Sequence, residues 1–137
     1  MTPFLLKIVT PYGVVYDGQA EELIVRTITG DIGFLARHAD AVAPLGMGRA
    51  TVIIDGETRY AACIGGMVSV KNGNVTLVPT TFEWAENIDV SRAEASKQRA
   101  EKVLADKNAT KTELTMAEAR LKRALVRTSV AVYKPKR

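Results

Sequence analysis

The sequence predicts an α+β chain, with a β sandwich or barrel followed by an antiparallel two-helix hairpin. Up to about residue 84, short runs rich in Val, Ile and Thr alternate with turn residues, which is typical of an all-β sandwich or barrel. After residue 89 there is no glycine and Pro135 is the only proline, so this part can be almost wholly helical. The net charge also changes, from −2 over residues 1–84 to +6 over residues 85–137. We therefore expect two units, 1–84 and 85–137.

Length and composition limit the class of protein. The 137 residues suffice for one domain, or for one compact domain with an appendage, which excludes a large enzyme. Hydrophobic residues make up 47% of the chain, so a core can be buried. No apolar run approaches the roughly 20 residues that span a bilayer, and the start of the chain lacks a signal-peptide pattern. We expect a soluble, intracellular protein.

Cysteine and histidine each occur once, as Cys63 and His38. One cysteine cannot form an internal disulfide or a cysteine metal cluster. We therefore expect no metal site, and both zinc chemistry and a Ser/His/Asp triad are disfavoured. From the residues alone, Cys63 is interpreted as a small buried hydrophobe, and His38 as a loop or core residue with satisfied hydrogen bonds.

Turn signals divide the N-terminal part into strands. The segment at 10–13 reads Thr-Pro-Tyr-Gly, which suits a type I turn between strands at 4–9 and 14–17. The pairs Asp55-Gly56 and Asn72-Gly73 are strong hairpin signals, because both central residues of a type I′ turn need positive φ. We expect two-residue hairpins at both places.

The second of these hairpins has a register that supports itself. About a turn at Asn72-Gly73, Val70 faces Val75 and Val68 faces Leu77, so four apolar side chains share one face. The Gly65-Gly66 pair interrupts a strand-like stretch and indicates a bulge or a close approach of two backbone segments.

The C-terminal part carries the signals of two capped helices. Asp89 can cap a first helix that runs to about Asp106, and Thr110 with Glu113 forms a capping box for a second that reaches about Val130. The short linker implies an antiparallel hairpin. Its facing residues are mostly alanine, so the seam is thin and the hairpin should be marginal by itself. The facing positions are Ala93, Ala100, Val103 and Leu104 on the first helix and Leu114, Ala117, Leu121, Ala124 and Leu125 on the second.

Short motifs along nearly the whole chain carry a family resemblance. They are IVTP at 8–11, TGDIGFL at 29–35 with His38, VAPL at 42–45, GGMVSV at 65–70 and NVTL at 74–77. In this order and spacing, with a β part and a helical part, the chain resembles the epsilon subunit of bacterial F-type ATP synthase. The segment IDVSRA at 88–93 is similar to the Ile/Leu-Asp-x-x-Arg-Ala motif of the epsilon subunits that bind ATP.

The resemblance implies a ten-stranded β sandwich, a C-terminal hairpin and a non-catalytic role in the rotating central stalk. In that family the sandwich binds the gamma subunit and sits on the ring of c subunits, which couples ion flow to ATP synthesis. The hairpin either folds against the sandwich or extends along gamma to the catalytic head of alpha and beta subunits, where it inhibits ATP hydrolysis. In some bacteria ATP holds the folded form. The implied location is peripheral, at the cytoplasmic face of the bacterial plasma membrane, which the protein reaches only through the complex.

The resemblance also assigns a contact with the c ring. It places Asp31 and His38 on the rim that meets the ring. The family usually has prolines on both sides of the histidine. At these places this sequence has Ala36, which Arg37 separates from His38, and Asp40. We expect the loop to have a different shape here.

Four arginines of the helical part indicate a binding site for a polyphosphate. Arg92 and Arg99 share one face of the first helix, and Arg123 and Arg127 share one face of the second. If the hairpin turns near Asn108, residue 92 lies level with about 124 and residue 99 with about 117. Guanidinium groups make bidentate, charge-assisted contacts with phosphate oxygens. We expect ATP as a regulatory ligand, without a requirement for magnesium.

The family resemblance extends this site beyond the arginines. It implies nucleotide contacts at Glu83, Ile88, Asp89, Arg92, Arg99, Arg123 and Arg127. The alternative is that the arginines form solvated faces with nearby acids, for instance Arg99 with Glu94 and Arg123 with Glu118. No glycine-rich phosphate loop of the form G-x-x-x-x-G-K-S/T is present, so we expect regulation by the nucleotide rather than its cleavage.

Two other classes of function are weighed against this one. A basic helical hairpin is compatible with a module that binds nucleic acid or another partner, but residues 85–137 offer only Tyr133 for base stacking, so we expect no nucleic acid partner. A small β-sandwich enzyme would need convergent acid and base groups, and one histidine with scattered carboxylates forms no such set.

Overall fold

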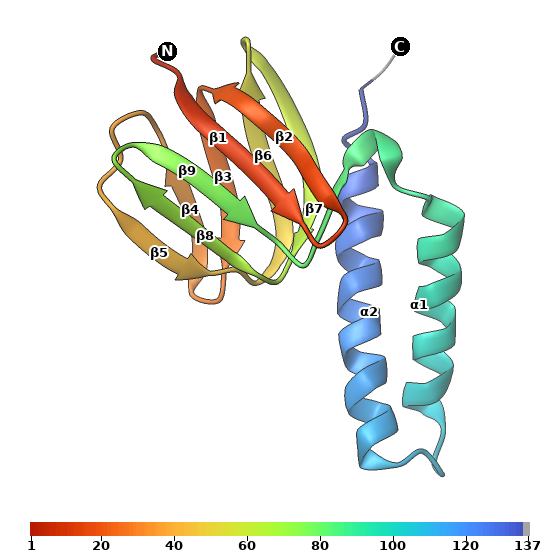
Figure 1. Ribbon diagram of the computed structural model, residues 1–137. Coiled ribbons are helices and arrows are strands. Elements are labelled where there is room, and N and C mark those ends of the chain that lie inside the picture. Colours follow the sequence, from red (N-terminus) through yellow and green to blue (C-terminus); the bar gives the residue numbers. More distant parts are fainter. Residues whose placement is uncertain (136–137) are drawn as a thin grey trace. The chain divides into compact units, whose positions relative to one another are not determined.

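A computed structural model describes residues 1–135 of the chain. The chain divides into two compact units, Met1–Trp84 and a second unit that begins at Ala85 (Figure 1). Residues 136 and 137, which the sequence analysis assigned to the helical unit, lie outside the described residues.

The first unit is a sandwich of two five-stranded sheets (Figure 1). One sheet has the order β2-β1-β9-β8-β5 and the other the order β10-β7-β6-β3-β4. The predicted fold class, a ten-stranded β sandwich followed by two helices, is confirmed. The strands are β1 (Phe4–Thr10), β2 (Gly13–Ala20), β3 (Glu22–Thr27), β4 (Gly30–Phe34), β5 (Ala41–Pro44), β6 (Met47–Ile54), β7 (Glu57–Ile64), β8 (Met67–Lys71), β9 (Asn74–Val78) and β10 (Thr81–Trp84).

The predicted hairpins form with the predicted register. Val70 pairs with Val75 and Val68 with Leu77 across β8 and β9. At the turn, Asn72 and Gly73 have φ of 52° and 79°, the left-handed values that a type I′ turn requires. Asp55 and Gly56 behave in the same way, with φ of 51° and 78°. Local turn chemistry therefore accounts for these two antiparallel pairs.

One pairing has no local cause. Strands β1 and β9 are parallel neighbours, with Leu6 beside Val75 and Ile8 beside Leu77, although nearly 70 positions separate them. Both strands turn apolar side chains toward the opposite sheet, so the pairing follows from burial of the core rather than from a turn.

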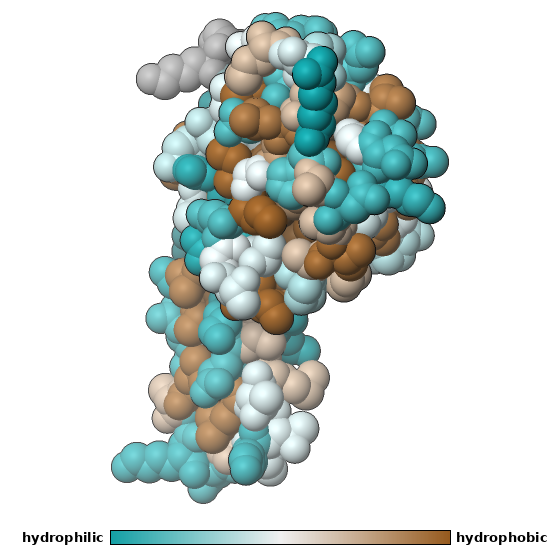
Figure 2. All heavy atoms as spheres, turned by 90° about the vertical axis from the view of Figure 1, so that its left-hand side faces the viewer, coloured by the Kyte–Doolittle hydropathy of each residue, from teal (hydrophilic) through white to brown (hydrophobic). Residues whose placement is uncertain are grey.

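Alternate residues of the strands form the core between the sheets. Leu23, Val25 and Leu77 are fully buried, as the alternation of side chains along a strand requires. Cys63 lies in the same core, as the sequence predicts, and its burial raises the pKa of the thiol to about 12. Apolar side chains also remain on the surface of the sandwich, where brown spheres stand among teal ones in Figure 2.

The Gly65-Gly66 pair lies where two backbone segments nearly touch. Both glycines have positive φ, 68° and 93°. A Cβ on Gly66 would lie 2.0 Å from the carbonyl oxygen of Val78 and 2.7 Å from the Cα of Pro79. The close approach predicted from the sequence is present, and it excludes every side chain at this position.

The second unit is a helical hairpin. After the short 3-10 helix η1 (Ala85–Asn87), α1 (Val90–Ala105) begins at its N-cap Asp89. Helix α2 (Lys111–Ala131) begins at Thr110, which forms the predicted capping box with Glu113. Both helix starts are therefore fixed by the side chains that the sequence analysis identified.

The seam between the helices is built from alanine. Ala93, Ala100, Ala117 and Ala124 are buried, and the larger Val103, Leu104, Leu114 and Leu121 are only partly buried. The prediction for Leu125 was wrong, because its side chain is 43% exposed. Successive helical residues are rotated by about 100°, so a seam that contains Ala124 turns Leu125 toward the side.

We expect Gly66→Ala to destabilise the sandwich by about 3 kcal/mol or more, since the new methyl group must displace backbone atoms as well as adopt a positive φ. The measurement is the free energy of unfolding in urea. Gly73→Ala is the matched control, because its φ is also positive but no atom lies within 4 Å of the added Cβ; a cost of about 1 kcal/mol is expected there. Equal costs for the two variants would contradict the steric explanation.

Candidate functional site

The four arginines of the predicted polyphosphate site lie on one side of the hairpin. Arg92, Arg99 and Arg123 each directly precede a buried seam alanine, and Arg127 follows Ala124 by three positions. In two antiparallel helices, residues offset in the same sense from the facing positions lie on the same side of the pair. Arg92 and Arg99 are two turns apart on α1, about 10 Å along its axis. The geometry thus provides a cationic side long enough for a chain of phosphates.

The local surroundings of these arginines differ between the helices. Arg92 and Arg99 on α1 are exposed, whereas Arg123 and Arg127 on α2 are half-buried. Within residues 1–135, neither Arg99 with Glu94 nor Arg123 with Glu118 forms the ion pair that the alternative interpretation expected. Among residues 1–135, Arg99 and Arg123 therefore lack the two particular acid partners that this alternative named.

Asp89 already has a structural role. Its Oδ1 accepts a hydrogen bond of 3.0 Å from the backbone N–H of Arg92, which caps α1. The neighbouring Ile88 is buried. A carboxylate has two oxygens, so capping occupies Asp89 only in part and is compatible with a further acceptor role.

Six of the seven predicted nucleotide contacts belong to the helical unit. Glu83 is the exception, because it lies in β10 of the sandwich, where it is half-buried. Nucleotide binding at the seven residues stays a prediction.

The two residues assigned to the c-ring contact are not brought together. Asp31 lies near the start of β4, where its Oδ1 is 2.7 Å from Nε of Arg26 on β3. His38 follows the opposite end of that strand, and about 10 Å of strand separates Asp31 from Phe34. The assignment of each residue to the c ring stays a prediction, but the two do not form one cluster.

Arg26 is a residue that the sequence analysis missed. The hydrogen bond to Asp31 raises the pKa of its guanidinium above the ordinary value. Its side chain lies where Gly48 has no side chain, because a Cβ there would be 2.6 Å from Cβ of Arg26. The positions of Arg26 and Asp31 on either side of the Thr27–Gly30 turn were the available signal.

His38 is held by its immediate neighbours. Its Nδ1 lies 2.7 Å from the carbonyl oxygen of Ala39, so this nitrogen carries the proton and donates it. The ring centroid is 4.8 Å from that of Phe34. These contacts fit the interpretation of a loop histidine with satisfied hydrogen bonds.

The loop that contains Ala36 and Asp40 is fixed without prolines. Asp40 Oδ1 accepts a hydrogen bond of 2.9 Å from the backbone N–H of Asn72, which ties the loop to the β8–β9 turn. Arg37 adopts a φ of 65°, unusual for a residue with a side chain.

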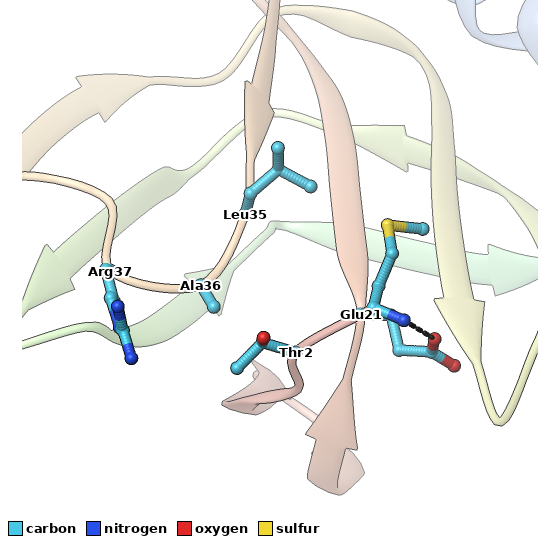
Figure 3. A pocket seen from close by; sticks show the side chains of 6 residues that line it. Thr2, Glu21, Leu35, Ala36 and Arg37 are labelled. Carbon is cyan, nitrogen blue, oxygen red and sulfur yellow. Dashed lines mark ion pairs between the residues drawn. The ribbon is translucent and has the colours of Figure 1, made fainter.

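Next to this loop is a shallow hollow of about 290 Å³, whose lining includes Leu35, Ala36 and Arg37 (Figure 3). At its other side the N-terminal ammonium of Met1 lies 3.7 Å from the carboxylate of Glu21. The hollow gathers charged groups of both signs at its rim and has no cluster of catalytic side chains.

Residues 1–135 contain neither a metal-binding cluster nor a membrane-spanning helix. No group of three or more His, Cys, Asp or Glu side chains is placed to hold a metal ion. No helix among these residues combines the length and the apolar character needed to cross a bilayer.

Comparison with known families accounts for both units. Residues 3–85 match the family described as ATP synthase, Delta/Epsilon chain, beta-sandwich domain, and residues 86–131 match ATP synthase, Delta/Epsilon chain, long alpha-helix domain. The chain belongs to the ATP synthase delta/epsilon chain family. The resemblance noted from the sequence is thereby confirmed, and a separate nucleic-acid-binding module is not favoured.

Individual relatives agree with this membership of the delta/epsilon family. The ATP synthase epsilon chain of Caldanaerobacter subterraneus subsp. tengcongensis is 42% identical over 129 residues, covering 93% of each chain. That of Ruminococcus albus is also 42% identical, over 132 residues, covering 96% of this chain and 98% of the relative. A chain in the cryo-EM structure of the Euglena gracilis mitochondrial ATP synthase has the same fold, with a TM-score of 0.83 at 18% identity, covering 97% of this chain and 83% of that one.

Proposed function

We propose that this chain is the non-catalytic epsilon subunit of the rotating central stalk, that its sandwich binds the gamma subunit and the c ring, and that its hairpin inhibits ATP hydrolysis unless bound ATP holds it folded. The observation that carries the proposal is the match of both units, in order, to the delta/epsilon family. The proposed location is peripheral, at the cytoplasmic face of a bacterial plasma membrane and only through the complex.

An apolar row on the outer face of one sheet supports the contact with gamma. Pro44 pairs with Met67, and Met67 with Val78. On the neighbouring strands Val9 pairs with Val14, and Val9 and Val78 are the residues that directly follow the last parallel pair, Ile8 with Leu77. Met67, Val78 and Val14 are 44%, 45% and 58% exposed. A continuous row of exposed apolar side chains is typical of a protein interface.

The alanine seam supports a hairpin that can be switched. Alanine buries one methyl group, so each seam contact contributes little, at about 0.8 kcal/mol per buried carbon. A ligand at about 100 times its dissociation constant, bound only to the folded form, stabilises that form by roughly 2.7 kcal/mol. A stabilisation of this size is sufficient to decide a balance between two forms.

The chemistry of the hairpin fits binding without cleavage. Four guanidiniums on one side attract a polyphosphate, and the γ-phosphate of ATP adds charge that ADP lacks. The sequence contains no G-x-x-x-x-G-K-S/T motif. ATP is therefore proposed as a regulatory ligand of the folded hairpin.

We expect Arg92→Ala and Arg99→Ala each to weaken ATP binding about tenfold or more, because a charge-assisted hydrogen bond typically contributes about 1.5 to 3 kcal/mol. Calorimetry on the isolated protein measures this. Lys97→Ala is the control, since Lys97 is a cation of α1 that the helical rotation of about 100° per residue turns to the side opposite Arg99. For Asp89 the informative variant is Asp89→Ser, which keeps a capping oxygen but removes the charge. If the wild-type protein gives no heat of binding even at millimolar ATP, the proposed site is contradicted.

Met67→Glu should weaken binding to the gamma subunit at least tenfold, because a carboxylate would replace an apolar side chain in the middle of the row. Thr58→Glu introduces the same charge at an exposed position of the other sheet and should bind normally. The assay is titration of the labelled protein with purified gamma. Unchanged affinity for Met67→Glu would place the interface elsewhere.

Removal of residues 89–137 should raise ATP hydrolysis by the assembled complex, because the inhibitory hairpin is then missing. In the intact complex, inhibition should deepen as ATP falls, since less ligand holds the hairpin folded. The measurement is the hydrolysis rate against ATP concentration for both forms. Superimposable curves would show that this hairpin does not inhibit.

A further inference from the structure

The joint between the sandwich and the hairpin is unusually short. The last strand, β10, ends at Trp84, and the helical unit begins at the next residue, Ala85. No unstructured linker lies between them, because η1 spans Ala85–Asn87 and Asp89 already caps α1. A reorientation of one unit has very few backbone torsions available.

On the sandwich side, Trp84 is held by three contacts. Its backbone pairs with Ala61 of β7 in the sheet. The guanidinium carbon of Arg59 lies 3.7 Å from the centroid of the indole ring, a close cation–π contact. The ring of Phe82 meets the indole edge-to-face, with centroids 4.9 Å apart. Trp84 is only 8% exposed, so it behaves as part of the sandwich.

The alternation of side chains explains why Arg59 is the residue that reaches the indole. Trp84 is paired with Ala61, and Arg59 lies two residues from Ala61 on β7, so its side chain leaves the strand on the same face. A diagonal neighbour at this spacing is within reach of a long side chain. The contact between Arg59 and Trp84 therefore follows from the β7–β10 register.

On the helical side, the residues directly after the joint belong to the hairpin. Helix α2 packs against η1. The backbone N–H of Ile88 donates to the carbonyl oxygen of Ala85, at 3.3 Å, and the N–H of Ala93 donates to that of Asp89, at 3.1 Å. The first bond closes the turn of η1 and the second the first turn of α1, while the packing of α2 against η1 makes η1 part of the unit that begins at Ala85.

We propose that Arg59 is a positioning residue that clamps Trp84 to the sandwich, so that the hairpin pivots about the single Trp84–Ala85 link. The inference deepens the proposed regulatory function, because it names the pivot of the hairpin that this function requires to move. A pivot limited to one link restricts the directions in which the hairpin can swing, since adjoining torsions are held by the sheet on one side and by η1 on the other. Loss of the clamp frees the end of β10 and moves the pivot into the sandwich.

The test uses the full chain, labelled with ¹⁵N, in a weakly aligning medium. Residual dipolar couplings should require two alignment tensors, with residues 81–84 following the sandwich and residues 86–88 following the hairpin. In Arg59→Met, couplings of residues 82–84 should fall by about half, and acrylamide quenching of Trp84, the only tryptophan, should rise about two- to threefold. Arg59→Lys keeps a cation and should restore most of both signals.

Arg49→Met is the matched control, because Arg49 makes a cation–π contact in the same sheet with a different ring, 5.0 Å from the ring centroid of Tyr60. It should leave the couplings of residues 82–84 unchanged. One tensor for the whole chain, residues 86–88 that follow the sandwich, or an Arg59→Met variant with unchanged couplings would each overturn the proposal. None of these outcomes decides ATP-dependent inhibition, which the hydrolysis curves test separately.

Discussion

Burial of one face of each sheet against the other is the constraint on which the sandwich depends. Ile8, Leu23 and Leu77 have no exposed surface, and each belongs to a strand whose alternate residues face the opposite sheet. Because a shift of one residue would turn all these side chains outward, burial fixes the register. The outer faces carry exposed side chains, among them the apolar row at Met67 and the Arg26–Asp31 pair.

The hairpin is held by a weaker version of the same effect. Its most buried seam residues are alanines, and the leucines on either side keep part of their surface exposed. The helix starts are nevertheless well determined, because Asp89 and the Thr110–Glu113 box satisfy backbone donors that would otherwise lack partners. Well-formed helices with a weak seam suit an element whose position a ligand and a partner can change.

Two regions of this chain are held by side-chain contacts rather than by prolines or by a longer strand. In the loop before β5, a hydrogen bond from Asn72 to Asp40 fixes a segment where the resemblance led us to expect prolines. At the joint, a cation–π contact and an edge-to-face ring pair hold the end of β10 without a longer strand. The Asp40–Asn72 and Arg59–Trp84 contacts each join residues that are distant in the sequence.

The sequence by itself determined what depends on neighbouring residues. The turn at Asn72-Gly73, the register of Val68 with Leu77, the close approach at Gly66 and both helix caps follow from backbone conformations and spacings within a few positions. The arginine positions also followed from helical spacing. Only the tertiary structure decided the parallel β1–β9 pair, the Asp40–Asn72 bond and the separation of Asp31 from His38. The reason is physical: these depend on which distant segments meet when the core is buried, and local propensity carries no record of that choice.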